Sequence, residues 1–193
     1  MTASREPSDP NDEDLMLAYQ AGDRGAFDQL YYRYARPIYN FFRRSAGRPD
    51  RAEDLCQKTF LKLHIARQRY RPEAPFRHWI FTIARNVLRD DARERRRRPA
   101  IEVASAEEQA PPAPRSNRCE TMDVGLMITE ALGTLPLSQR EVLVLNRYQG
   151  MNYAEIGAIL GISENAAKQR AFQGMQTLRR RLRGMDDVRH DVS

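Results

Sequence analysis

Apolar residues recur along this chain at spacings of three and four, the period of helices that bury one face. The longest such stretch in the first half follows Asp23, a residue type that caps helices, and runs to Phe42. A shorter apolar stripe begins at Glu13 and stops at Gly22. Pro37 lies inside the longer stretch, and we expect it to kink that helix because proline lacks an N–H and clashes with the preceding turn.

Two further helices are predicted before residue 98. Asp50 and Glu53 have the spacing of a capping box, which would open the third helix after a break at Gly47. The fourth helix is expected from Phe76 to about Arg97, after a polar loop that contains two prolines. The apolar face of the third helix consists of Ala52, Leu55, Cys56, Thr59, Phe60 and Leu63.

The segment 99–122 differs in composition from what precedes it. Four prolines stand among Ala, Glu and Ser with almost no large apolar residues, which is typical of a flexible linker. Such a linker would span ~27 Å on average as a coil and ~80 Å when fully extended. The domains on either side can therefore dock at separate sites on one large partner. Residues 1–12 are polar and lack periodicity, so we expect a disordered arm.

The chain from residue 123 predicts a second helical domain. A capping box from Ser138 to Glu141 would open one of its helices, and the segment Asn152–Glu155 would open a short one. Ser163 can cap a last long helix that ends near residue 183. No strand pattern is present, so the predicted fold is all-α. The expected domains are 13–98 and 123–184, followed by a tail at 185–193.

The segments Tyr153–Leu160 and Ser163–Arg183 predict a helix-turn-helix. Gly161 tolerates the left-handed backbone of a tight turn, and Ile162 can pack the second helix onto the first. The second helix would offer its N-terminal part to a major groove. Between residues 167 and 183 it carries six bases and no acid, which suits phosphates, although a hairpin that is merely basic is the alternative. Its outward face comprises Asn165, Lys168, Gln169, Phe172 and Gln173.

The charge balance strengthens the case for a nucleic-acid partner. The chain has 32 Lys and Arg against 26 Asp and Glu, and only Lys58, Lys62 and Lys168 are lysines. Arginine's planar fork suits phosphates and base edges. Seven arginines against three acids lie between Arg85 and Arg98, beside a buried aromatic face. A solvated helix end is the alternative interpretation of that run.

Several classes of protein are disfavoured. Cys56 and Cys119 cannot form a disulfide scaffold and lack zinc-site spacing, so we expect reduced thiols in a cytoplasmic protein. The three histidines are scattered, and no metal or other cofactor is predicted. No apolar run approaches the ~20 residues of a membrane span, and the polar start does not resemble a signal peptide. No catalytic triad or Gly-rich phosphate loop is present, so an enzyme is not predicted.

Four segments, taken in order, resemble the extracytoplasmic-function (ECF) class of bacterial sigma factors. The first spans 21–34, and the second, 50–63, is similar to the part of region 2 that binds the clamp helices of RNA polymerase. The third, 76–97, resembles the segment that melts and reads the −10 promoter element. The fourth, 135–163, resembles region 4, which reads the −35 element.

The resemblance implies roles for individual residues. It assigns core-polymerase binding to Asp54, Gln57, Lys58 and Phe60. Most relatives have Glu at the position of Lys58. It assigns binding of −10 DNA to Arg69, Tyr70, Arg71, Trp79, Arg85, Asn86, Arg89 and Arg93. Trp79 fits core packing at least as well as base stacking. It assigns binding of −35 DNA to Lys168, Gln169, Arg170, Phe172, Gln173, Arg179 and Arg180. Lysine can read guanine and glutamine can read adenine. Relatives often carry Arg in place of Gln173.

The implied function is that of a sigma factor that binds core RNA polymerase and directs initiation from specific promoters. Its expected partners are core RNA polymerase, duplex −35 DNA, melted −10 DNA and an anti-sigma factor, and its activity is expected to respond to a stress or another signal. The alternative is a stand-alone helix-turn-helix regulator with an N-terminal sensing or dimerisation domain. That alternative does not explain the arginine run in the first domain.

Overall fold

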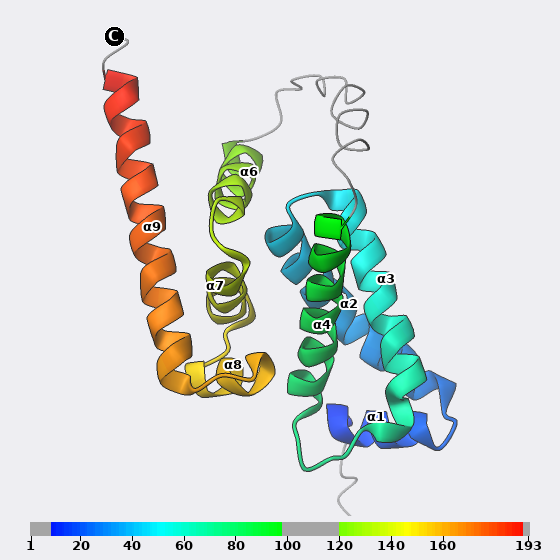
Figure 1. The fold of residues 1–193 in the computed structure, drawn as a ribbon. Coiled ribbons are helices and arrows are strands. Elements are labelled where there is room, and N and C mark those ends of the chain that lie inside the picture. Colours follow the sequence, from blue (N-terminus) through cyan, green and yellow to red (C-terminus); the bar gives the residue numbers. More distant parts are fainter. Residues whose placement is uncertain (1–8, 98–119, 191–193) are drawn as a thin grey trace, which may run out of the picture.

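The computed structural model describes residues 9–97 and 120–190, and these ranges contain helices and no strand (Figure 1). The predicted all-α fold is therefore confirmed. The first half contains α1 (Asp12–Gln20), α2 (Arg24–Ala46), α3 (Pro49–Ala66), the short 3-10 turn η1 (Arg67–Arg69) and α4 (Phe76–Arg97). The second half contains α6 (Glu120–Gly133), α7 (Leu137–Gln149), α8 (Tyr153–Leu160) and α9 (Glu164–His190).

Helices α2, α3 and α4 pack into the first domain around a core rich in phenylalanine. The rings of Phe41 and Phe81 meet edge-on with centroids 5.9 Å apart, a favoured geometry for aromatic pairs. Helix α2 continues through Pro37 to Ala46 and ends at Gly47, whose φ of +86° is the left-handed conformation that glycine adopts without strain.

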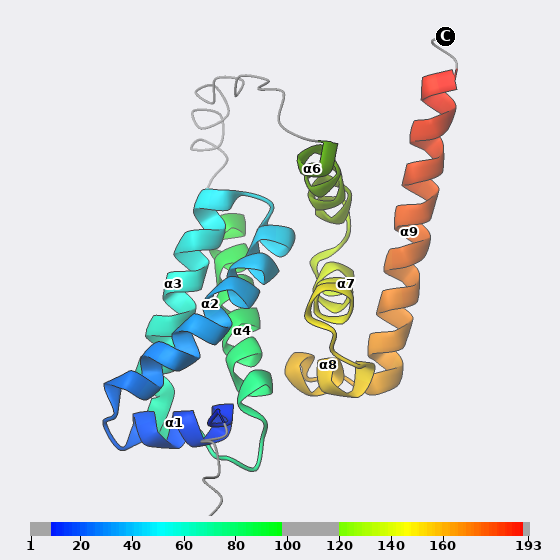
Figure 2. The same ribbon diagram turned by 180° about the vertical axis from the view of Figure 1, so that it is seen from behind.

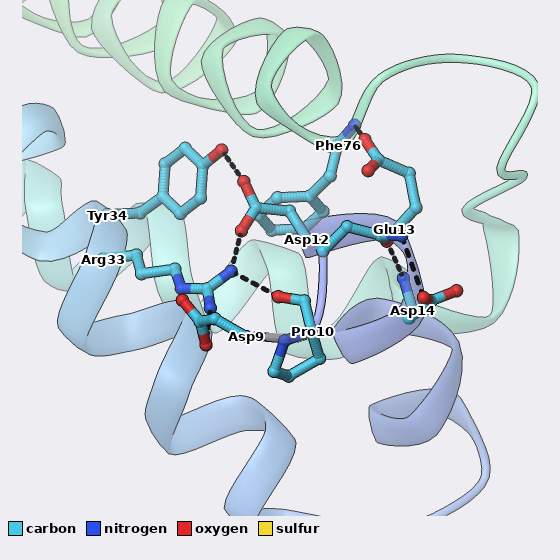
Figure 3. Close-up of polar contacts among 9 residues, drawn as sticks. Asp9, Pro10, Asp12, Glu13, Asp14, Arg33, Tyr34 and Phe76 are labelled. Atoms are coloured by element: carbon cyan, nitrogen blue, oxygen red, sulfur yellow. Dashed lines mark hydrogen bonds and ion pairs between the residues drawn. The ribbon is translucent and has the colours of Figure 1, made fainter. Parts of the chain in front are cut away.

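Helix α1 is tied to both α2 and α4 by polar contacts (Figure 3). The carboxylate of Asp12 accepts hydrogen bonds from the Tyr34 hydroxyl and from Arg33, at 2.7 Å for the latter. Glu13 Oε1 accepts from the backbone N–H of Phe76 at 2.8 Å, which satisfies a donor at the start of α4. Because Asp9 also pairs with Arg33, residues 9–12 belong to the fold and not to a disordered arm. Residues 1–8 lie outside the described part.

Two of the predicted capping boxes are wrong. Helix α3 begins at Pro49, which suits the first helical position because it needs no N–H partner, so Asp50 is not the cap. Helix α7 begins at Leu137, directly after Pro136, and Ser138 does not cap it. The expected reciprocal residue, Glu141, is instead fully buried.

The starts of both helices of the helix-turn-helix agree with the prediction. Asn152 and Glu155 form a capping box: Asn152 Oδ1 accepts from Glu155 N at 2.9 Å, and Glu155 Oε2 accepts from Asn152 N at 2.7 Å. Ser163 Oγ accepts from Ala166 N at 3.1 Å and so satisfies a donor at the start of α9. The turn between α8 and α9 contains Gly161 at a φ of +64°, as expected.

The two domains pack against each other. Helices α2 and α4 of the first domain contact α6, α7 and α8 of the second, and both ribbon views show α7 and α8 beside α2 and α4 (Figures 1 and 2). Helix α6 begins at Glu120, inside the expected linker, and α9 continues into the expected tail as far as His190. The remaining linker residues through 119, including Cys119, lie outside the described part.

Replacing Gly157 by Ala should destabilise the second domain by about 1–3 kcal/mol. An added Cβ would lie 2.8 Å from the carbonyl oxygen of Ile162, a backbone atom in the tight turn. Urea unfolding followed by circular dichroism measures the loss. The control is Gly133→Ala, where no atom lies within 4 Å of the added carbon. Equal stability of the two variants would contradict the steric argument.

Replacing Glu155 by Gln should cost about 1 kcal/mol at pH 7, because the amide oxygen can still accept from the N–H of Asn152 but lacks the charge that strengthens this hydrogen bond. The N–H of Asn152, and then His78, hold the pKa of Glu155 below its usual range. A carboxylate whose pKa is lower in the folded protein than in the unfolded chain stabilises the fold at a pH above its unfolded pKa. This stabilisation is lost as the pH falls through the folded pKa. The difference in unfolding free energy between wild type and variant should therefore vanish in acid. Unfolding at several pH values tests this, with Glu130→Gln as an exposed control. A deficit that does not change with pH would argue against a role for the charge.

Candidate nucleic-acid and polymerase-binding surfaces

The turn of the helix-turn-helix positions the exposed face of α9. The N–H of Ile162 donates to the carbonyl of Gly157 at 2.9 Å, and the small residue at 157 permits this close approach. Ala167 and Ala171 are buried and bring α9 close to its neighbours. The intervening side chains of α9 therefore face outward.

Most predicted −35 residues lie on this outward face. Lys168, Gln169, Phe172 and Gln173 are exposed, and Phe172 has 62% of its surface accessible. Lys168 Nζ lies 2.7 Å from Glu164 on the same face, so bound DNA would compete with that carboxylate. Arg170 is half-buried, whereas Arg179 and Arg180 are exposed about two turns beyond Phe172.

The predicted −10 residues separate into surface and core. Tyr70 is buried, its hydroxyl donates to the carbonyl of Ala74 at 3.0 Å, and it packs 5.2 Å from Trp79. The expectation that Tyr70 offers a ring to a base is wrong, because α4 covers that ring. Trp79 is half-buried and also packs against Phe76, which favours the packing interpretation. On the turn before α4, Arg69 and Arg71 are exposed.

The remaining −10 residues lie along α4 and differ in exposure. Asn86 and Arg93 are exposed and line an open cavity of about 630 Å³, together with Lys62 and the apolar Ile65. Arg85 also lines it, but its Nη2 donates to the carbonyl of Leu160 in the second domain at 2.9 Å. Burial, followed by the charge of Arg89, lowers the pKa of Arg85.

Arg89 makes the most buried contact of this surface. Its Nη2 and Nε lie 3.0 and 3.3 Å from the two carboxylate oxygens of Glu141 on α7. Glu141 is inaccessible to solvent, and such a carboxylate needs a partner that also hydrogen-bonds it. The sequence did not indicate this pair, because Glu141 has the spacing of a capping residue.

The predicted polymerase-binding residues lie on α3. Asp54, Gln57 and Lys58 are exposed, and Lys58 Nζ lies 2.7 Å from Asp54 Oδ2. Phe60 is buried, with its ring 4.7 Å from that of Tyr31, so its expected role as a direct contact is wrong. Leu61, an apolar residue four positions after Gln57, is 59% exposed on the same helix, and its apolar character did not single it out in the sequence.

Among the described residues, no group of three or more His, Cys, Asp and Glu side chains is placed to hold a metal ion. Within the same residues, no helix is both long and apolar enough to cross a bilayer. Cys56 is buried, and burial raises the pKa of its thiol to about 11.

Known protein families match both domains of the chain. The Sigma-70 region 2 family matches residues 30–98, and the Sigma-70, region 4 family matches residues 125–178. The chain is 37% identical over 164 residues to RNA polymerase sigma factor CarQ of Myxococcus xanthus, covering 85% of this chain and 93% of CarQ. It is 31% identical over 172 residues to ECF RNA polymerase sigma factor SigM of Mycobacterium tuberculosis, covering 89% and 85% of the two chains.

The fold also matches a solved structure. The structure of CnrH in complex with the cytosolic domain of CnrY superposes with a TM-score of 0.69 at 26% identity, over 90% of this chain and 97% of CnrH. The first domain is therefore sigma region 2, the second is region 4, and a stand-alone regulator is disfavoured. The chain belongs to the ECF family of RNA polymerase sigma factors.

Proposed function

We propose that this sigma factor binds core RNA polymerase through the exposed face of α3 and reads promoters with α9 and α4. The observation that carries the promoter assignment is the outward face of α9, where Lys168, Phe172 and Gln173 are exposed beside the turn. Polymerase makes the RNA, so the chain needs no catalytic site, and its place of action is the cytoplasm.

The chemistry of α9 supports reading of a duplex −35 element. Lys168 can donate to guanine, Gln169 and Gln173 can pair with adenine, and Phe172 can touch a thymine methyl group. Arg170, Arg179 and Arg180 supply positive charge near the same helix, which suits phosphate contacts that position it without reading sequence.

The chemistry of α4 supports binding of a melted −10 strand. Asn86 and Arg93 border an open cavity that also has an apolar wall at Ile65 and Ile83. Extrusion of a base costs a few kcal/mol, so a protein that captures one must offer such a pocket. Arg69 and Arg71 extend the positive surface along the preceding turn.

A regulatory partner is part of the proposal. The solved relative CnrH is in complex with the cytosolic domain of CnrY, and we expect an anti-sigma factor to bind this chain as well. An apolar cavity of about 800 Å³ between α6, α7 and α9 offers a surface for a partner helix. Its walls include Ile128, Leu132, Met175 and Leu178.

The proposed function is tested by transcription in vitro. Core RNA polymerase is mixed with the purified protein and genomic fragments of the source organism, and transcript starts are sequenced. Protein-dependent starts that share two upstream elements would support the proposal. Specific duplex binding without any binding to core polymerase would overturn it.

Lys168→Ala and Gln173→Ala should each weaken transcription and relax specificity at one position of the −35 element, by about 1–3 kcal/mol. The measurement is transcription from a set of promoters that differ at single −35 positions. Arg180→Ala serves as the comparison, because loss of a phosphate contact weakens all promoters alike. If Lys168→Ala lowers every promoter equally, Lys168 is a phosphate contact instead.

Asp54→Arg should weaken binding to core polymerase about tenfold, equivalent to about 1.4 kcal/mol. The change reverses a charge on the proposed docking face and also removes the ion pair with Lys58. Labelled core polymerase titrated with the full-length protein gives the affinity, and binding to duplex −35 DNA should stay unchanged. Asp28→Arg, an equal reversal on α2, controls for net charge. Unchanged polymerase affinity would remove Asp54 from the docking face.

A further inference from the structure

Residues 67–75, the segment that joins α3 to α4, are held to the end of α1 by one side chain. Gln20 Nε2 donates to the carbonyl of Arg67 at 2.6 Å and to the carbonyl of Tyr70 at 3.1 Å. In return, Gln68 Nε2 donates to the carbonyl of Gln20 at 3.1 Å. These partners are separated by 47 to 50 positions in the chain, so the contacts are tertiary and not local. Helix α1 therefore fixes the start of this α3–α4 segment.

The first turn of α1 holds the other end of the α3–α4 segment. Glu13 Oε1 accepts from the backbone N–H of Phe76, the first residue of α4, at 2.8 Å. A neighbouring carboxylate fixes this turn of α1 on α2, because Asp12 accepts hydrogen bonds from both Arg33 and Tyr34 (Figure 3). Helix α1 thus contacts the segment at both ends while it stays anchored on α2.

Between its two ends, the α3–α4 segment has one buried side chain. Tyr70 is 1% exposed, and its hydroxyl donates to the carbonyl of Ala74 at 3.0 Å. Residues 71–75 are all exposed, and Pro72 and Pro75 have no N–H to donate. A segment with little buried surface and few backbone hydrogen bonds opens easily. The contacts with α1 at its two ends therefore have a large share in fixing its position.

The same segment joins the two walls of the cavity that is proposed to take an extruded base. The end of α3 supplies one wall, which includes Ile65 and Ala66, and α4 supplies the other. Gln20 holds the residue that directly follows the first wall, and Glu13 holds the first residue of the helix that forms the second. A binding site keeps its selectivity when its walls are held within about 0.5 Å of their productive positions.

We propose that α1 is the positioning element of the −10 site, with Gln20 and Glu13 holding the α3–α4 segment so that the cavity is in place before a base is extruded. The inference rests on the −10 role proposed for α4. Both side chains are half-buried and act through the segment, so they are positioning residues and not contacts to DNA. The preference for bases in the −10 element should depend on them. The preference in the −35 element should not, because α9 lies in the other domain.

Gln20→Met tests the first contact. Methionine keeps the length of the side chain but has no N–H to donate, so both carbonyls lose this partner. The full-length protein and core polymerase transcribe one promoter that depends on this protein, and all single-base variants of its −10 and −35 elements. The readout is the ratio of transcription between the best and the worst base at each position. Partial unfolding lowers both rates alike, so a merely structural defect leaves this ratio unchanged.

We expect Gln20→Met to lower the ratio at least threefold at one or more −10 positions and less than twofold at every −35 position. Gln29→Met is the matched control, because it makes the same change at an exposed residue of α2. This control should keep all ratios within twofold of the wild type. Unchanged −10 ratios in Gln20→Met, equal losses in both promoter elements, or equal effects of the two variants would overturn the proposal.

A pair of variants at Glu13 separates its hydrogen bond from its charge. Glu13→Leu and Glu13→Gln both remove a negative charge from the first turn of α1, but only glutamine keeps an oxygen that can accept from the N–H of Phe76. We expect Glu13→Leu to lower the −10 ratios as Gln20→Met does, and Glu13→Gln to stay within twofold of the wild type. If both variants lower the ratios equally, the charge matters instead and Glu13 is not a positioning residue.

Hydrogen exchange of the free protein separates this inference from the proposed function. Mass spectrometry follows deuterium uptake in peptides that cover residues 67–76. In Gln20→Met we expect exchange there to be at least fivefold faster, with no change in α9. Unchanged exchange overturns the contact between α1 and the segment, and faster exchange with unchanged −10 ratios overturns the positioning role alone. If the wild type directs no transcription, the proposed function fails and the −10 role of α1 fails with it, whereas exchange still reports whether α1 holds the segment.

Discussion

Burial of the apolar face of α2 is the constraint on which the rest of the structure depends. Leu30, Ile38, Phe41 and Phe42 are fully buried, and α1, α3 and α4 all pack on this helix. Because large side chains fixed in a core leave little freedom to neighbouring helices, α2 sets the places of α3 and α4. The proposed polymerase-binding face and the proposed −10 surface are the outward sides of those two helices.

The same helix also takes part in the contact between domains. The carbonyls of Pro37 and Ser45 accept hydrogen bonds from Gln149 and Arg140 of region 4. Both acceptors are backbone carbonyls, so a change in their partners removes no apolar side chain from the core of region 2. These polar contacts join region 4 to region 2 beside the apolar contacts that the two domains share.

Arginine links stability and recognition in this chain. One guanidinium can bind a backbone carbonyl, a carboxylate or a phosphate, because all three present oxygen acceptors to the same planar fork. Arg85 and Arg89 use the first two kinds of partner within the protein, and the proposed function assigns them the third. Local composition alone therefore cannot separate an arginine that holds the fold from one that binds DNA.

The sequence by itself determined the helical fold and the helix-turn-helix, because both depend on local spacing. The period of apolar residues placed the helices, and Asn152, Gly161 and Ser163 were identified from the backbone needs of a cap or a turn. Only the tertiary structure decided which surface residues are available. Tyr70 and Phe60 lie in the core, and Glu141 is buried against Arg89 and is not a helix cap. The physical reason is that burial and long-range pairing depend on how distant helices pack, which periodicity within one helix does not specify.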